Sequence, residues 1–252
     1  MVRVLFRSIN TAVFCVVLCM LSGCGQKEPP LVVLTTGEVA PFSMKDKNDN
    51  LTGFDIELVN LLAETLGRDV EWKCVRFDDI IKQVQAKRAD IGIGAISITE
   101  DREQSVNFSP AYHIGGFALL MLEGTSDNLE DLISKKFGVR QGTWQEKAIK
   151  TAWADKPNLF VQSFGSQSTE DILAKLRSGE LVAFVLDADE AKHIVDNNNG
   201  LKIVPLDIGV LGMGIVTAKG SIYSSQVADF FEKHVEQVRK LETKWFSAAS
   251  NK

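Results

Sequence analysis

The stretch Asp90–Tyr112, DIGIGAISITEDREQSVNFSPAY, carries the most specific pattern in this chain of 252 residues. It opens with an apolar, β-branched run that ends in small residues, which lets a ligand approach the backbone of a buried strand. Hydroxyl side chains follow, and Arg102 then falls in the first turn of a predicted helix. A guanidinium binds a carboxylate through two parallel hydrogen bonds, and a helix N-terminus also attracts anions. The stretch therefore predicts a site for a small carboxylate.

Strand and helix patterns alternate along the rest of the chain. Leu31–Thr35 and Val70–Val75 are typical of strands, whereas apolar residues recur at helical spacing over Phe54–Leu66. A further apolar strand pattern, Ala183–Leu186, is followed directly by Asp187. Towards the C-terminus, Ser221–Leu241 predicts one long amphipathic helix.

Alternating strands and helices favour open, largely parallel sheets. In such sheets ligands bind beyond the carboxyl ends of the strands. Polar residues that directly follow predicted strands are therefore the first candidates for a binding site. These residues are Thr36, Ser97, Thr143 and Asp187.

The first 23 residues are typical of a bacterial lipoprotein signal peptide. Two arginines precede an apolar run over residues 11–21, which is too short for a stable membrane span. The run ends at Leu21-Ser22-Gly23-Cys24, which resembles the lipobox, where cleavage precedes a cysteine that is then acylated. We expect a signal peptide over 1–23, lipid on Cys24 and a tether over 24–30. The alternative is an ordinary signal peptide with a chance cysteine.

Composition excludes several classes of function. The formal net charge is −5 and no run of Lys or Arg occurs, so nucleic acid is an unexpected partner. Only Cys74 would remain as a free thiol after processing, which excludes an internal disulfide and a thiolate metal site. Its alternation with Trp72 predicts a buried thiol. The three histidines share no metal-ligand spacing and no nucleotide-binding loop occurs, so neither a metal nor a cofactor is expected.

Several short motifs, taken together and in order, resemble the periplasmic solute-binding proteins of polar amino-acid ABC transporters, family 3. The motifs are Pro41-Phe42, Gly53-Phe54-Asp55-Ile56-Glu57-Leu58, Phe77-Asp78, Ala89-Asp90-Ile91, Ser97–Arg102, Asn107–Tyr112, Gly142-Thr143, Leu186-Asp187 and Lys244-Trp245-Phe246. The resemblance implies an α/β fold of two lobes, each a mostly parallel sheet flanked by helices, joined by two hinge strands. Carried over to this chain, lobe one comprises 31–117 and 213–252, lobe two comprises 123–205, and the hinge lies near 117–122 and 205–212.

The resemblance also implies roles for individual residues. Arg102 would bind the α-carboxylate of a ligand, Asp187 would bind the α-ammonium, and Phe77 would pack along the ligand. Further positions expected around the carboxylate are Gly94, Ala95, Ser97 and Thr143. The alternatives are a surface ion pair for Arg102, a helix cap for Asp187 and a core position for Phe77.

The ligand's identity depends on positions where this chain departs from its relatives. Thr36 stands where many relatives carry an acid that touches a cationic side chain, and Val39 stands where an aromatic residue often follows. Arg140 and the nearby Trp144 lie in the second lobe, and we hypothesise that Arg140 binds a side-chain carbonyl or carboxylate. Glutamine or glutamate is therefore favoured over arginine or another amino acid, although Glu38 can substitute for the missing acid.

The sequence thus predicts a monomeric, lipid-anchored receptor that delivers a free amino acid to an ABC permease, on the periplasmic side of a bacterial membrane or at the cell surface. Ligand favours the closed form, because both lobes touch it only there. Two other classes remain open. A small-acid dehydratase on the same scaffold would need a general acid or base in the cleft, for which Glu38 is the unassigned candidate. A sensor ectodomain is disfavoured, because no membrane span or signalling module follows Phe246.

Overall fold

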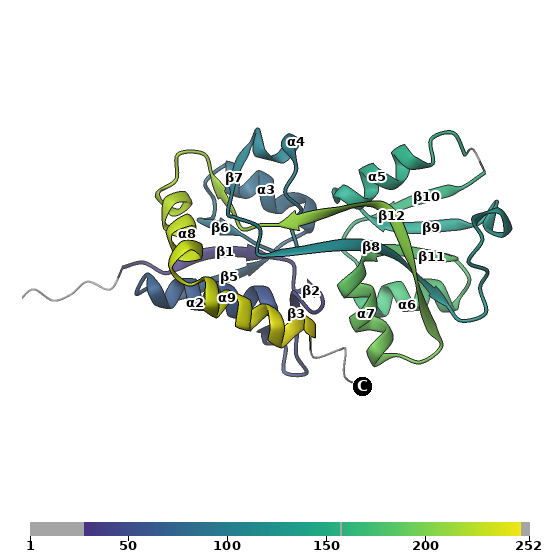
Figure 1. Cartoon of the computed structure of the whole chain (residues 1–252), viewed down its shortest axis with the longest axis horizontal. Coiled ribbons are helices and arrows are strands. Elements are labelled where there is room, and N and C mark those ends of the chain that lie inside the picture. Colours follow the sequence, from purple (N-terminus) through teal and green to yellow (C-terminus); the bar gives the residue numbers. More distant parts are fainter. Residues whose placement is uncertain (1–27, 157, 248–252) are drawn as a thin grey trace, which may run out of the picture.

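The computed structural model describes residues 28–156 and 158–247, and it consists of two α/β lobes joined by two long strands (Figure 1). The expected signal peptide and Cys24 lie outside these residues. Within the described part of the chain, no helix has the length and apolar character needed to cross a membrane. The expected two-lobed α/β fold is confirmed.

Lobe one is built on a five-stranded mixed sheet. Its strand order is β5 (Val70–Cys74), β1 (Leu31–Thr35), β6 (Ile91–Gly92), β13 (Val216–Ala218) and β7 (Val106–Phe108). The first three strands are parallel, and β13 runs antiparallel to both of its neighbours. A separate three-stranded sheet follows β1 and contains β2 (Glu38–Val39), β3 (Ser43–Lys45) and β4 (Leu51–Thr52).

Helices cover both faces of the lobe-one sheet. They are α2 (Phe54–Thr65), α3 (Phe77–Gln85), α4 (Glu100–Glu103), α8 (Ile222–Lys233) and α9 (Val235–Glu242), followed by a π-helical turn over Thr243–Ser247. The single helix expected over Ser221–Leu241 is wrong, because the chain leaves helical geometry at His234. The break lets α8 and α9 bend, so that Phe230 and Val238 both pack into the same core.

Lobe two contains the second five-stranded sheet. Its order is β10 (Phe160–Phe164), β9 (Lys136–Arg140), β11 (Ala183–Asp187), β8 (His113–Leu122) and β12 (Leu201–Met213). A 3₁₀ turn (Leu129–Leu132) and the helices α5 (Trp144–Ala152), α6 (Thr169–Arg177) and α7 (Ala188–Asn197) complete the lobe. The N-terminus of α6 is fixed by a capping box between Ser168 and Asp171.

The strands β8 and β12 form the connection between the lobes and lie side by side (Figure 1). Residues 117–122, expected at the hinge, lie within the lobe-two sheet, because all but the last of them also pair with β11. Their continuous apolar character suits this central position, where both faces of a strand are covered. The crossing ribbon instead contains His113–Gly115 paired with Leu211–Met213, next to a register shift that begins after Leu206.

Cys74 is exposed, so the prediction of a buried thiol is wrong. The strand β5 lies at the edge of its sheet, and Val70 and Trp72 do pack against the lobe-one core. The alternating burial ends before Cys74, which is the last residue of the strand.

Candidate functional site

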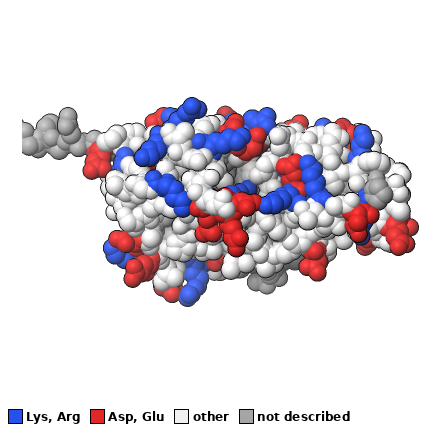
Figure 2. Space-filling view, turned by 90° about the horizontal axis from the view of Figure 1, so that it is seen from above, with Lys and Arg blue, Asp and Glu red and all other residues white. Residues whose placement is uncertain are grey.

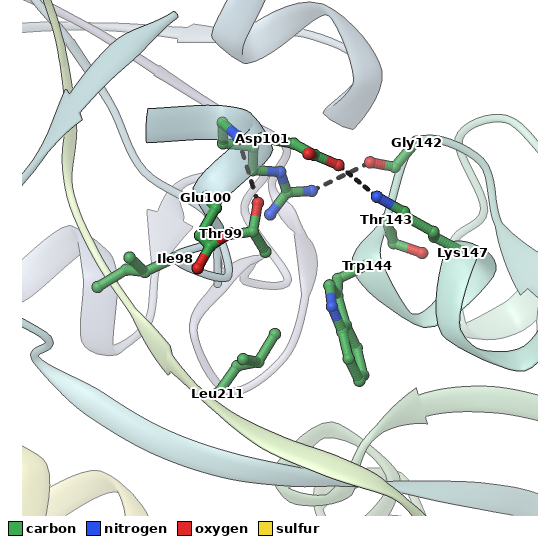
Figure 3. Close-up of a pocket in the computed structure, with 10 residues that line it drawn as sticks. Ile98, Thr99, Glu100, Asp101, Gly142, Thr143, Trp144, Lys147 and Leu211 are labelled. Carbon is green, nitrogen blue, oxygen red and sulfur yellow. Dashed lines mark hydrogen bonds and ion pairs between the residues drawn. The ribbon is translucent and has the colours of Figure 1, made fainter. Parts of the chain in front are cut away.

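Residues of both lobes meet around the cleft, where they enclose a cavity of about 460 Å³ (Figure 3). Ile98 to Arg102 approach it from lobe one, Gly142 to Trp144 and Lys147 approach it from lobe two, and Leu211 comes from the crossing strand β12. Lys147 forms an ion pair with Asp101 across the gap. The two lobes are therefore in contact, and charged side chains of both signs mix over the middle of the molecule (Figure 2).

Arg102 lies at the centre of this contact. Its Nη1 donates to the carbonyl of Ser97 at 2.7 Å, and its Nη2 donates to the carbonyl of Gly142 at 3.1 Å. The guanidinium lies 5.6 Å from the ring centroid of Phe77. Burial lowers the pKa of Arg102 to about 10, against the opposing effect of the Asp187 charge. Arg102 thus stays cationic at neutral pH and has no carboxylate partner within the described chain, since Asp101 pairs with Lys147.

A turn at Gly94 and Ala95 leads from β6 towards Ser97. Both residues have positive φ, at 149° and 53°, which is a costly conformation for alanine. The Ala95 N–H donates to the Asp55 carboxylate at 3.1 Å, which holds the turn in place. Burial raises the pKa of Asp55 to about 7, while the Ala95 bond opposes this shift. Asp55 belongs to a motif quoted above, but the sequence alone assigned no role to it.

Asp187 is a buried carboxylate at the end of β11 with an incomplete set of partners. It occupies the N-cap position of α7 but makes no side-chain capping bond, so the helix-cap alternative does not apply. Its Oδ1 has no hydrogen-bond partner within the described chain. Burial raises the pKa of Asp187 to about 8, and the Glu190 charge adds to this effect while Arg140 opposes it. A buried acid of this kind is stabilised by a cationic group.

Arg140, which is expected from the sequence to bind the ligand side chain, already has an acidic partner in the structure. Its Nη1 and Nη2 donate to the two carboxylate oxygens of Glu190 at 2.7 and 2.6 Å, and both side chains are buried. The Arg140 Nε has no partner within the described residues. The sequence could not reveal this pair, because its members are 50 residues apart and no local pattern links them.

The predicted residues after β1 divide between the cleft and the core. Thr36 is buried, and its hydroxyl accepts a hydrogen bond from the Glu38 N–H at 3.3 Å. The Glu38 carboxylate in turn accepts a hydrogen bond from Ser166 of lobe two. Val39 is only 3% exposed and packs in the lobe-one core, so it is not brought to the cleft.

Two predicted residues at the start of α5 have structural contacts of their own. The Thr143 hydroxyl donates to the Arg140 carbonyl at 2.7 Å and accepts from the Glu146 N–H at 3.2 Å. Trp144 stacks on Phe117 of β8, with ring centroids 4.9 Å apart. Trp144 thus borders the cavity in Figure 3 while it packs against the crossing strands.

His113 forms a bridge between the lobes that the sequence did not predict. Its Nε2 lies 2.9 Å from Asp189 on α7, and its Nδ1 lies 2.9 Å from Glu242 on α9. Ionised carboxylates only accept hydrogen bonds, so both contacts are satisfied when the ring is protonated. Burial lowers the pKa of His113, but the hydrogen bonds to Asp189 and Glu242 raise it more, and the net pKa is raised. The partners are 76 and 129 residues away in sequence.

We expect the His113→Gln variant to lower the thermal midpoint at pH 5.5 by a few degrees. The raised pKa means that the stabilisation is complete below the ordinary value of 6.5 and is lost as pH rises through the folded-state value. Because Asp189 and Glu242 are partly exposed, the loss in free energy of unfolding should be about 1 kcal/mol, which lowers the thermal midpoint by roughly 2–4 °C for a chain of this size. Calorimetric melting from pH 5 to 9 measures it.

The control for this prediction is His193→Gln, which removes a histidine from α7 that makes no such bridge. The loss of stability in His113→Gln should shrink towards pH 9. Burial lowers the pKa of His193, so the control should instead be stabilised relative to wild type at low pH, which is the opposite sign. A difference that stays constant with pH would contradict the protonated bridge.

Two α/β lobes, a pair of crossing strands, and opposed cationic and anionic groups in the cleft define the class of two-lobed solute-binding proteins. Residues 31–248 match the model of the bacterial extracellular solute-binding proteins, family 3, and the chain belongs to this family.

Its relatives include an arginine-binding extracellular protein of Bacillus subtilis, which is 25% identical over 90% of this chain and 89% of that protein. A probable histidine-binding protein of Campylobacter jejuni is 33% identical over 67% of this chain and 64% of that protein. Among solved structures, an ancestral arginine-binding protein bound to glutamine is 33% identical, with a TM-score of 0.79 over 88% of this chain and 99% of that chain.

Proposed function

We propose that this protein binds a free L-amino acid between its lobes and delivers it to an ABC permease. The α-carboxylate would bind Arg102, and the α-ammonium would bind Asp187. The observation that carries the proposal is the buried carboxylate of Asp187, which has an unpartnered oxygen and a raised pKa. A ligand ammonium supplies the cationic partner that this carboxylate lacks. Binding to both lobes would favour the closed form.

We further propose that the ligand carries an amide or basic side chain, with glutamine and arginine as the leading candidates. Three acids act on the region around Arg140: Glu190, Asp187 and Glu38. Asp187 is assigned to the ammonium and Glu190 neutralises Arg140, which leaves Glu38 to interact with the ligand side chain. This charge balance favours glutamine and arginine over glutamate. A relative of known structure has been solved with glutamine and with arginine.

Titration calorimetry against the twenty amino acids tests the proposal. We expect glutamine or arginine to bind at least tenfold more tightly than glutamate, a difference of about 1.4 kcal/mol. Absence of binding by every amino acid would contradict the proposed function. Glutamate as the preferred ligand would contradict the assignment of the side chain.

The dehydratase alternative has a structural neighbour but no supporting contact in the cleft. That neighbour is an ancestral amino-acid-binding protein, described as a precursor of cyclohexadienyl dehydratase, with 29% identity and a TM-score of 0.76. The candidate acid Glu38 already accepts a hydrogen bond from Ser166 of the other lobe. Incubation with prephenate or arogenate distinguishes the two functions, because only the enzyme forms a product.

The proposed location is the periplasmic side of a bacterial membrane or the cell surface, in keeping with an extracellular solute-binding family. Lipid on Cys24 is the proposed anchor, and the tetrad Leu21-Ser22-Gly23-Cys24 supports it. A receptor held at the membrane surface meets its permease by diffusion in two dimensions.

A further inference from the structure

We infer that Glu190 is a specificity-determining residue that closes this cleft to acidic amino acids. It does so by binding the Arg140 guanidinium, which would otherwise be a free cation at the carboxyl end of β9. This inference rests on the proposed function and identifies the group that selects among amino-acid side chains. Glu190 acts through Arg140 and need not touch the ligand.

The geometry of the pair leaves Arg140 little capacity for a second carboxylate. Both terminal nitrogens donate to Glu190, at 2.7 and 2.6 Å, in the two-bond arrangement that a ligand carboxylate would also need. The Nη2 also lies 3.5 Å from the Gln167 carbonyl. Glu190 is fully buried and Arg140 is nearly so, which keeps water from competing for the pair.

The fold places this pair beside the proposed ammonium site. The strands β9 and β11 are parallel neighbours, with Val139 opposite Val185, so Arg140 and Asp187 end up at the same edge of the sheet. Glu190 follows Asp187 by three residues, which puts both acids on one side of α7 in its first turn. The Arg140 charge also interacts with Glu38 of lobe one. Arg140 therefore lies where groups from both lobes converge.

Three lysines that line the inter-lobe pockets are also paired with acidic side chains. Lys45 pairs with Asp49 at 2.8 Å, Lys82 pairs with Asp79 at 3.5 Å, and Lys147 pairs with Asp101. Arg102 is assigned to the α-carboxylate of the ligand. Within the described part of the cleft, a second ligand carboxylate would thus have to displace an existing acid or stay unpaired, and an unpaired buried charge is strongly disfavoured. An amide on the ligand brings no charge, and the positive charge of a guanidinium would be met by Glu38, the acid proposed for the ligand side chain.

A contribution to the stability of the fold is a weak explanation for the presence of the Arg140–Glu190 pair. A buried ion pair contributes little more than apolar residues of similar volume, because desolvation of both charges offsets their attraction. The pair also has a functional consequence, because Arg140 without Glu190 would attract an acidic ligand side chain.

The test is the ratio of the dissociation constants for glutamate and glutamine in the Glu190→Gln variant. The amide keeps the shape of the side chain but removes its charge, so Arg140 becomes available to a ligand carboxylate. We expect the ratio to fall at least tenfold relative to wild type. A folded variant with an unchanged ratio, including one that loses affinity for both ligands equally, would overturn the inference. Glu180→Gln is the matched control, because it breaks an exposed pair with Lys175 in the same lobe and should leave the ratio unaltered.

A second variant covers the case in which Glu190→Gln does not fold. Arg140→Gln removes the cation and leaves the negative charge of Glu190 uncompensated, so the glutamate-to-glutamine ratio should rise. A ratio that stays constant or falls would overturn the inference. Failure of the wild type to bind any amino acid would instead contradict the proposed function, so the two failures can be distinguished.

Discussion

Replacement of Arg102 by alanine is expected to abolish stabilisation of the protein by its amino-acid ligand. In the proposed complex the guanidinium would provide two hydrogen bonds and a full charge to the ligand carboxylate, and nothing else described in the cleft offers an unpaired cation. In the wild type, ligand at a hundred times its dissociation constant should add about 2.7 kcal/mol to the free energy of unfolding. The variant should show no shift in the thermal midpoint at the same ligand concentration.

The unliganded Arg102→Ala protein should remain folded, because among the described residues the guanidinium bonds to two backbone carbonyls and lies over the face of Phe77. Lys147→Ala is the matched control. It removes another cation from the rim of the same cavity, where the side chain is exposed, and should keep ligand stabilisation close to the wild-type value. Ligand stabilisation that persists in Arg102→Ala would refute its role as the carboxylate-binding residue.

Replacement of Asp187 by asparagine should remove ligand binding and yet raise the stability of the unliganded protein at pH 7. Burial raises the pKa of Asp187 to about 8, so the folded state holds a proton that the unfolded state has already released. The contribution of this group to stability is complete below its ordinary pKa and is lost as pH rises from about 4 to about 8. Asparagine carries no such penalty, so the variant should gain on the order of a few kcal/mol at pH 7.

Melting curves from pH 4 to 9 measure this effect, and Asp196→Asn on the exposed face of α7 is the control. The same raised pKa predicts that the ligand ammonium displaces a proton from Asp187 when it binds near pH 7. The enthalpy of binding should then depend on the ionisation enthalpy of the buffer. Wild-type affinity in Asp187→Asn, or a lower stability of this variant at pH 8, would contradict the assignment.

Local sequence patterns predicted the elements that have a strong local signal. The strand β1 and the helix α2 agree with the structure, because each depends on residues a few positions apart. The sheet β2–β3–β4 has strands of only two or three residues, which are too short to show a period. The bend at His234 depends on how two helices share one core, and no local pattern records it.

The predictions for the site residues differ in the same way, according to whether the signal is local or long-range. Arg102 and Asp187 could be located because one follows β6 and the other ends β11, and both lie at the carboxyl edge of a sheet. The partner of Arg140 and the two partners of His113 could not, because side chains 50 to 129 residues apart pair only once the fold exists. The predicted role of Arg140 therefore did not take into account the charge of Glu190, its partner in the structure.

The ribbon of β8 and β12 has a mechanical consequence for release of the ligand. Both crossing strands lie side by side, so they would form the axis of the proposed rotation of one lobe relative to the other. Such a rotation would move each atom in proportion to its distance from the axis. His113 lies in the ribbon itself and is therefore close to the axis. Two contacts join the lobes outside the ribbon, one between Lys147 and Asp101 and the other between Ser166 and Glu38. A small rotation would therefore separate those outer contacts before the His113 bridge, and the cleft would open first at its mouth.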